Sequence, residues 1–136
     1  MKKLWQLCRI GKQYDFSAAH HLPLVYDGHP CKRMHGHNYL VEVEIRGEIA
    51  PLNGFCNQVD FSDIDQIMKP IIAKLDHQVL NDFIENPTAE NIAAYLLSEF
   101  QANSLRYLFA VKVWETPKCW AMVVNDGGFY EGIHRE

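Results

Sequence analysis

Long apolar runs, basic clusters and closely spaced cysteines are all missing from this 136-residue sequence. No apolar run approaches the roughly 18 residues of a membrane-spanning helix. The first six residues, MKKLWQ, lack the apolar centre of a secretory signal peptide. We therefore expect the chain in the cytoplasm, with no membrane partner. In that reducing compartment, four cysteines spread between Cys8 and Cys119 are not expected to form a disulfide framework.

Positive charge is also scarce, since 13 Lys and Arg stand against 17 Asp and Glu, a formal net charge of −4. Binding to nucleic-acid phosphates needs a concentrated basic surface, so nucleic acid is not an expected partner. Apolar residues make up 48% of the chain, with only 8 glycines and 6 prolines, which is the composition of a globular protein. The length predicts one domain covering residues 1–136.

Two strands are expected in the first third of the chain. Residues 4–20 predict a long strand that is irregular near Gly11. Residues 37–48 predict a second strand, because apolar and charged side chains alternate from Val41 to Arg46, the period-2 pattern of a half-buried strand. The segment between them, 22–33, contains glycine and prolines and predicts a loop.

Two helices and two further strands follow. The apolar residues of 62–75 recur at helical spacing, with Ser62 as the expected N-cap and Pro70 expected to kink or loosen the helix. Residues 88–102 predict a second helix. Two final strands are expected to form a hairpin: 107–115 and 119–125. The order β, β, α, α, β, β indicates an α+β fold, with an antiparallel sheet and both helices on one face.

Histidine is the residue type that carries most of the chemical information. His35 and His37 are two apart at the start of a strand, so their imidazoles project from the same face, and Gly36 leaves room beside them. His20, at the end of the preceding strand, could supply a third imidazole if the two strands pair. Three neutral imidazoles with an open fourth position are typical of a catalytic Zn²⁺ site. His21 is expected on the opposite face of its strand, away from the metal.

Cys31 has two interpretations, which its four-residue spacing from His35 does not separate. It could be a fourth metal ligand, which would close the site. Alternatively it stands unligated beside the metal as a base or nucleophile, where zinc, Lys32 and Arg33 would favour its thiolate form. His29, in the same loop, is expected to be solvated.

Two further positions carry groups that could act at such a site. Asp76 and His77 follow the first predicted helix, and they matter only if the fold brings them to the metal. Glu115 follows an apolar strand, and its carboxylate could form two parallel hydrogen bonds with an amidine-like ring edge. Solvated surface residues are the alternative interpretation at both positions.

Six short segments, in order over nearly the whole chain, form a pattern far more specific than any one of them. They are FSAAH at 16–20, CKRMHGH at 31–37, DF at 60–61, LDHQVLN at 75–81, NPTAENI at 86–92 and VWETP at 113–117. Together they resemble the 6-pyruvoyltetrahydropterin synthase / 6-carboxytetrahydropterin synthase family. The run before the DF segment, Gly54–Asp60, departs from the family's usual pattern because it is longer and more polar.

The resemblance implies the tunnelling fold, with a four-stranded antiparallel sheet and two antiparallel helices. It implies a homo-oligomer, typically a hexamer formed by two trimers, with active sites between subunits. It also implies Zn²⁺ as the cofactor, held by His20, His35 and His37.

The same resemblance assigns roles to the remaining candidate residues. Cys31 would be the proton acceptor. Asp76 and His77 would form a proton relay that reaches the metal across a subunit boundary, and Glu115 would anchor the pterin edge and assist this relay. The segment expected to line the pterin pocket consists of Thr88, Ala89 and Glu90.

The three residues between Cys31 and His35 are typical of the bacterial 6-carboxy branch of this family, since the pyruvoyl branch has a longer insert. The resemblance therefore implies a zinc-dependent lyase that converts 7,8-dihydroneopterin triphosphate to 6-carboxy-5,6,7,8-tetrahydropterin, acetaldehyde and triphosphate, on the route to queuosine and other 7-deazapurines. The alternatives are 6-pyruvoyltetrahydropterin synthase activity, without side-chain cleavage, and a non-catalytic protein that binds pterin and zinc.

Overall fold

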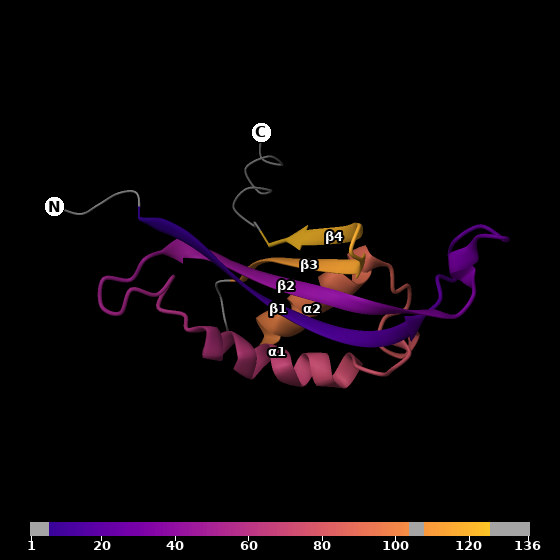
Figure 1. The fold of residues 1–136 in the computed structure, drawn as a ribbon, viewed down its shortest axis with the longest axis horizontal. Helices are drawn as coiled ribbons and strands as arrows, with labels where there is room; N and C mark the ends of the chain where they lie inside the picture. Colours follow the sequence, from indigo (N-terminus) through magenta and orange to yellow (C-terminus); the bar gives the residue numbers. More distant parts are fainter. Residues whose placement is uncertain (1–5, 104–107, 126–136) are drawn as a thin grey trace.

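Four antiparallel strands in one sheet and two helices on one of its faces form the fold of the computed structural model (Figure 1). The structure describes residues 6–103 and 108–125. The strands, in their order across the sheet, are β1 (Leu7–His20), β2 (His35–Glu48), β3 (Leu108–Thr116) and β4 (Cys119–Val124). The helices are α1 (Phe61–Leu75) and α2 (Ala89–Ala102), with short 3₁₀ helices at Pro30–Lys32 and Leu80–Asp82. The predicted order ββααββ is confirmed.

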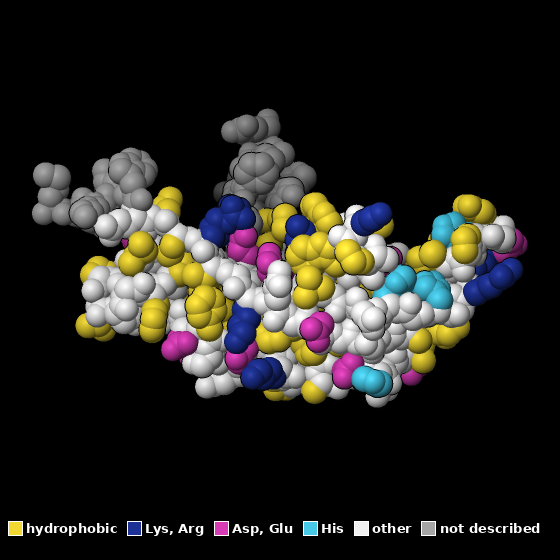
Figure 2. Space-filling model, in the orientation of Figure 1, with side chains coloured by type: hydrophobic (Ala, Val, Ile, Leu, Met, Phe, Trp, Pro, Cys, Tyr) yellow, Lys and Arg dark blue, Asp and Glu magenta, His cyan; other side chains and the backbone are white. Residues whose placement is uncertain are grey.

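The two longest strands, β1 and β2, pair along their full length, from Leu7 opposite Glu48 to His20 opposite His35. The predicted alternation places every second residue of Tyr39–Ile45 in the core, where these side chains are fully buried. β2 begins two residues earlier than predicted because its pairing with β1 continues to the His20–His35 pair. The end of this long hairpin where residues 21–34 connect the two strands therefore carries histidines on both strands, and Figure 2 shows histidine side chains gathered there.

α1 begins one residue earlier than predicted, and Asp60, not Ser62, is its N-cap. The Asp60 carboxylate accepts a hydrogen bond from the Ser62 N–H at 2.9 Å, while the Asp63 carboxylate accepts one from the Asp60 N–H at 2.9 Å. This reciprocal capping satisfies N–H groups that a helix leaves free at its start. Pro70 lies inside α1 without ending it, and the helix continues to its predicted last residue.

α2 begins at Ala89, one residue after its predicted start, because Thr88 is its N-cap: the Thr88 hydroxyl accepts a hydrogen bond from the Asn91 N–H at 3.1 Å. α2 contacts β3 and β4, whereas α1 contacts β1. The apolar sides of both helices therefore face the same side of the sheet, and the core lies between them (Figure 1). Leu96 and Phe100 of α2 are fully buried in it.

A short segment after α1 lies along the outer edge of β1. It forms a parallel bridge to Ala19, whose N–H donates to the Gln78 carbonyl at 2.9 Å. The His77 N–H donates to the Ser17 carbonyl at 2.6 Å, and His77 adopts a left-handed φ of 60°. This turn brings the Asp76–His77 pair to the histidine end of β1.

The remaining boundaries agree with the sequence to within a few residues. Residues 4, 5 and 107 of the predicted strands lie outside the described residues. Within the described ranges, no helix is long and apolar enough to span a membrane.

Candidate metal and substrate site

Three imidazoles converge at the end of the β1–β2 hairpin. His20, His35 and His37 each offer a ring nitrogen, and these three atoms lie within 4.8 Å of one another. His20 and His35 are direct cross-strand partners, and His37 is on the same face of β2 as His35. His20 is 1% exposed, so the cluster begins in the core and opens outward through the two half-buried histidines of β2.

Backbone carbonyls fix the orientation of two of these rings. Nδ1 of His20 donates to the Pro87 carbonyl at 2.7 Å, and Nδ1 of His35 donates to the Arg33 carbonyl at 2.7 Å. Each Nε2 then carries a lone pair, and the two Nε2 atoms face each other at 3.0 Å. Two lone pairs at that distance repel unless a cation or a proton lies between them. The donor set therefore fits a metal ion, with carbonyls orienting the ligands as they do in protein metal sites.

Burial favours the neutral, ligating form of the imidazoles. It lowers the pKa of His20 to about 4. It also lowers the pKa of His37, although the nearby Glu115 carboxylate opposes this shift. Metal ligation requires deprotonated imidazole nitrogens, so these rings need not lose a proton to bind a cation at neutral pH. Three nitrogen ligands leave a tetrahedral Zn²⁺ one position for a substrate oxygen or water.

A cavity of about 290 Å³ brings together the four residues expected to bind the pterin. Thr88, Ala89 and Glu90 contribute the start of α2, and Glu115 contributes the end of β3. Glu115 Oε2 lies 4.0 Å from His37 Nε2, so this cavity borders the histidine cluster. Sequence reasoning missed four other lining residues, which carry no motif of their own: Leu22, Cys119, Trp120 and Ala121.

A second cavity, of about 580 Å³, is lined in part by His37 itself. Its lining includes His37 and His77, so one chain already brings the predicted relay histidine to the same hollow as a predicted metal ligand. The Asp76 carboxylate accepts a hydrogen bond from the Ser17 N–H at 2.9 Å and lies 3.0 Å from His77 Nδ1. The hydrogen bond from Ser17 is the main reason that the pKa of Asp76 is below its ordinary value. An ionised Asp76 can therefore orient the exposed His77 ring.

Cys31 lies in the 3₁₀ helix Pro30–Lys32 and is half-buried. Its carbonyl accepts a hydrogen bond from the Leu22 N–H at 2.8 Å, which folds the loop back toward the end of β1. Within the described residues, the cluster of converging ligand atoms contains the three imidazoles without the Cys31 sulfur. Lys32, which was expected to favour the thiolate, instead pairs with Asp27 at 2.6 Å.

The two other histidines near the site have structural partners. The His21 backbone exchanges hydrogen bonds with the Asn81 side chain, at 3.0 and 2.9 Å. His29 accepts a hydrogen bond from the Cys31 N–H at 3.0 Å and caps the 3₁₀ helix. Neither belongs to the converging cluster.

Comparisons with known proteins agree with this geometry. A family model described as 6-pyruvoyl tetrahydropterin synthase matches residues 9–126. The chain is 42% identical over 115 residues to an Archaeoglobus fulgidus protein named provisionally as 6-carboxy-5,6,7,8-tetrahydropterin synthase, covering 84% of this chain and 93% of that one. It is 34% identical to the 6-carboxy-5,6,7,8-tetrahydropterin synthase of Synechocystis, covering 79% and 85% of the two chains. Among solved structures, the 6-pyruvoyl tetrahydropterin synthase of Caenorhabditis elegans matches with a TM-score of 0.78 and 26% identity, over 88% of this chain and 96% of that one.

Proposed function

This chain belongs to the 6-pyruvoyl tetrahydropterin synthase family, with its tunnelling fold, and from that premise we propose that it is a zinc-dependent lyase. Its proposed substrate is 7,8-dihydroneopterin triphosphate, and its proposed products are 6-carboxy-5,6,7,8-tetrahydropterin, acetaldehyde and triphosphate. The observation that carries the proposal is the convergence of three imidazoles, two of them oriented by backbone carbonyls, beside a cavity that Glu115 lines. The names of the Archaeoglobus and Synechocystis relatives favour the 6-carboxy product.

The metal would be held by His20, His35 and His37. When bound, Zn²⁺ supplies Lewis-acid polarisation of the substrate's side-chain oxygens, which acidifies the adjacent C–H bonds. The carbonyls of Pro87 and Arg33 keep two of the ligand lone pairs directed at one point, so little reorganisation is needed when the metal binds.

Glu115 would fix the pterin ring. Its carboxylate at the wall of the 290 Å³ cavity can accept two parallel hydrogen bonds from the 2-amino and N3 edge of the ring. Thr88 and Glu90 would line the opposite wall at the start of α2, and Ala89 would contribute through its backbone. Because Glu115 lies 4.0 Å from His37, a ring anchored there would direct its side chain toward the three histidines.

Cys31 would accept the first proton from the substrate side chain, as a base in reach of the cluster but not bound to it. His77, oriented by the ionised Asp76, would move protons on the opposite side, where it shares a cavity with His37. Triphosphate would then leave by elimination. Hydrolytic cleavage of the bond between the first and second side-chain carbons would release acetaldehyde, with water supplying the second oxygen of the carboxylate. A base and an acid on opposite sides of one carbon chain allow these proton transfers without large movement of the substrate.

We also propose that the working form is a homo-oligomer in the cytoplasm, a hexamer of two trimers. Both cavities are open hollows on the surface of one small domain, and such hollows close when a neighbouring subunit covers them. Light scattering should give a mass several times the 15.7 kDa of one chain. A stable, active monomer would contradict this arrangement.

The decisive experiment is incubation of zinc-loaded protein with 7,8-dihydroneopterin triphosphate, followed by mass analysis of the products. We expect 6-carboxy-5,6,7,8-tetrahydropterin and acetaldehyde together with triphosphate. Triphosphate and a pyruvoyl pterin without acetaldehyde would assign the alternative activity, which is the one named for the Drosophila melanogaster relative that is 32% identical. Pterin binding without release of triphosphate would leave only the non-catalytic alternative. The place of the product in queuosine or other 7-deazapurine synthesis is tested by whether a strain lacking the gene loses the modified base.

A further inference from the structure

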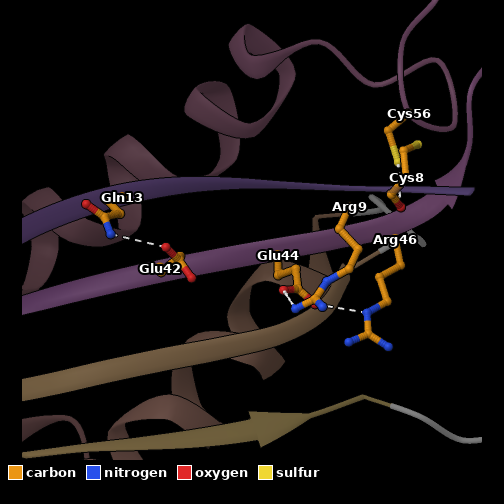
Figure 3. A network of polar contacts seen from close by, with 7 residues as sticks. All are labelled: Cys8, Arg9, Gln13, Glu42, Glu44, Arg46 and Cys56. Carbon is orange, nitrogen blue, oxygen red and sulfur yellow. Dashed lines mark hydrogen bonds and ion pairs between the residues drawn. The ribbon is translucent and has the colours of Figure 1, made fainter.

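Two cysteines with no place in the proposed reaction lie beside each other at the end of the sheet opposite the histidines. Cys8 is near the start of β1 and Cys56 is in the loop between β2 and α1, so 47 residues separate them along the chain. Figure 3 shows their side chains side by side. The Cys56 thiol lies 3.6 Å from the Cys8 carbonyl oxygen, and the Cys8 thiol lies 3.5 Å from the carbonyl of Gly47 on β2.

The loop that carries Cys56 is held in place by its own hydrogen bonds. Cys56 forms an antiparallel bridge with Ile49, and the Asn57 N–H donates to the Glu48 carbonyl at 2.8 Å. The Asn57 side chain donates to the Arg46 carbonyl at 2.8 Å and accepts from the Glu48 N–H at 3.1 Å. These bonds attach the loop to the end of β2, which is paired with β1 at Cys8. The two thiols are therefore brought together by the fold itself.

The two thiols differ in their access to solvent. Cys56 is 4% exposed, and burial together with the neighbouring Cys8 raises its pKa to about 12. Cys8 is half-buried and lines a cavity of about 340 Å³ together with Leu7, Arg9, Arg46 and Gly47. A small reagent can therefore reach Cys8 first. The Arg9 and Arg46 guanidinium groups at this cavity share the Glu44 carboxylate as an ion-pair partner, and the net positive charge of these three groups favours an anionic reagent (Figure 3).

We propose that Cys8 and Cys56 form a reversible disulfide that links β1 to the β2–α1 loop when the chain meets an anionic small-molecule disulfide of the glutathione class. The Cys8 thiolate attacks one sulfur of the reagent, forming a mixed disulfide and releasing one thiolate of the reagent. The Cys56 thiolate then attacks the Cys8 sulfur and displaces the second. Two protein thiols are oxidised, one reagent disulfide is reduced, and the two protons leave with the released thiols.

This order of attack follows from the surroundings of the two sulfur atoms. A Cys8 sulfur in a mixed disulfide carries no negative charge. Cys8 therefore no longer disfavours the ionisation of Cys56. The Cys56 sulfur already lies 3.6 Å from the Cys8 carbonyl oxygen, in a loop that the Asn57 hydrogen bonds hold against β2. The expectation of no disulfide framework rested on the wide spacing of the four cysteines and on a reducing compartment, whereas this single pair is brought together by the fold and is oxidised only where the disulfide reagent is present.

The proposal is tested on the purified full-length protein in buffers of reduced and oxidised glutathione. After each incubation, remaining thiols are blocked with a maleimide and the cysteine peptides are mapped by mass spectrometry. In oxidised buffer we expect one peptide pair joined through Cys8 and Cys56, lighter by about 2 Da than its two peptides together, and reversal by a dithiol reductant. The exposed Cys119 serves as an internal control, because it should react with the oxidant but stay outside the cross-link.

Two variants separate the steps. In Cys56→Ser, one glutathione should accumulate on Cys8, because the resolving thiol is missing. In Cys8→Ser, Cys56 should stay unmodified, because its sulfur is buried. If either variant fails to fold, a time course on the unaltered protein replaces it, and glutathione should appear on Cys8 before the cross-link forms. The proposal would be overturned if maleimide labelled both Cys8 and Cys56 while Cys119 carried glutathione. A cross-link from Cys8 to another cysteine would overturn it as well.

Discussion

The two ends of the β1–β2 hairpin are built from the same pairing but serve different purposes. At the histidine end, backbone carbonyls of Pro87 and Arg33 hold imidazoles so that their unshared electron pairs face one another. At the cysteine end, the polar groups of Asn57 bond to the backbone of β2 and close a loop. The first arrangement costs local stability as long as no cation lies between the rings, since facing lone pairs repel. The second gains stability and leaves no comparable convergence of ligand atoms among the described residues.

The contrast predicts that substitutions at the histidine end change chemistry, whereas substitutions at the cysteine end change folding. His35→Ala should have the largest effect, because it removes a proposed metal ligand whose Nε2 lies 3.0 Å from that of His20. We expect zinc per chain to fall and turnover to drop to the background rate, with little change in the Tm of the metal-free protein. The matched control is His21→Ala, next to a ligand but outside the cluster. Loss of zinc in His21→Ala, and not in His35→Ala, would reverse the ligand assignment.

The next largest effect is expected from replacing a cysteine with alanine, a substitution that can be made at both ends of the β1–β2 hairpin. Cys31→Ala should keep its zinc and lose about 10²–10⁴ in turnover, the usual cost of removing a general base. Cys8→Ala, at the other end, should keep both zinc and turnover in reducing buffer. The measurements are zinc content and product formed from dihydroneopterin triphosphate. Loss of zinc in Cys31→Ala would identify Cys31 as a fourth ligand, and near-normal turnover would remove it from the mechanism.

Glu115→Gln should give a smaller, purely binding-related change. It keeps the shape of the side chain but replaces a charged acceptor with an amide, so that one of two parallel hydrogen bonds to the ring edge is lost. Pterin affinity should weaken by about 10–100-fold, the range for a hydrogen bond to a charged group, while zinc content stays the same. The check is pterin titration by fluorescence alongside zinc analysis. Unaltered affinity would refute the role of Glu115 as the anchor.

The smallest effect is expected at the cysteine end and should appear only in stability. A Cβ at Gly47 would collide with the Asn57 side chain, so Gly47→Ala must displace the bonds from Asn57 to Arg46 and Glu48. We expect a loss of about 1–3 kcal/mol in the free energy of unfolding, measured by urea denaturation, with normal turnover per folded chain.

A double-mutant cycle checks the physical reason for this loss. In the Asn57→Ala background the obstructing side chain is gone, so adding Gly47→Ala should cost much less than it does alone. Additive losses in the double variant would mean that the collision with Asn57 is not the cause.

Sequence patterns predicted the structural features that depend on residues close to one another along the chain. The alternation around Val43 predicted β2 and its buried face, and the motif histidines predicted a cluster because strand geometry alone puts His35 and His37 on one face. The prediction of Ser62 as the N-cap of α1 was wrong. Two aspartates, Asp60 and Asp63, form the capping box instead, and its second position usually has glutamate or glutamine.

The parts that sequence could not predict depend on backbone atoms or on long-range contacts. The Pro87 carbonyl orients His20 from 67 positions away, and a carbonyl is present at every residue, so no side-chain pattern marks it. The turn at His77 depends on a left-handed φ that only its bond to Ser17 explains. The Cys8–Cys56 contact likewise requires the hairpin and the loop to be in place first.

The hydrogen bond from His20 to Pro87 has a consequence for substrate length. Pro87 orients the proposed metal ligand His20, and Thr88, the next residue, lines the cavity proposed for the pterin ring. One peptide unit, with its fixed covalent dimensions, would therefore help to set the spacing between the ring pocket and the metal. We expect such a site to select by length, accepting a ligand when the span from its ring to its reacting carbon matches that spacing. Analogues lengthened or shortened by one carbon in this span should fit either the pocket or the metal, but not both at once.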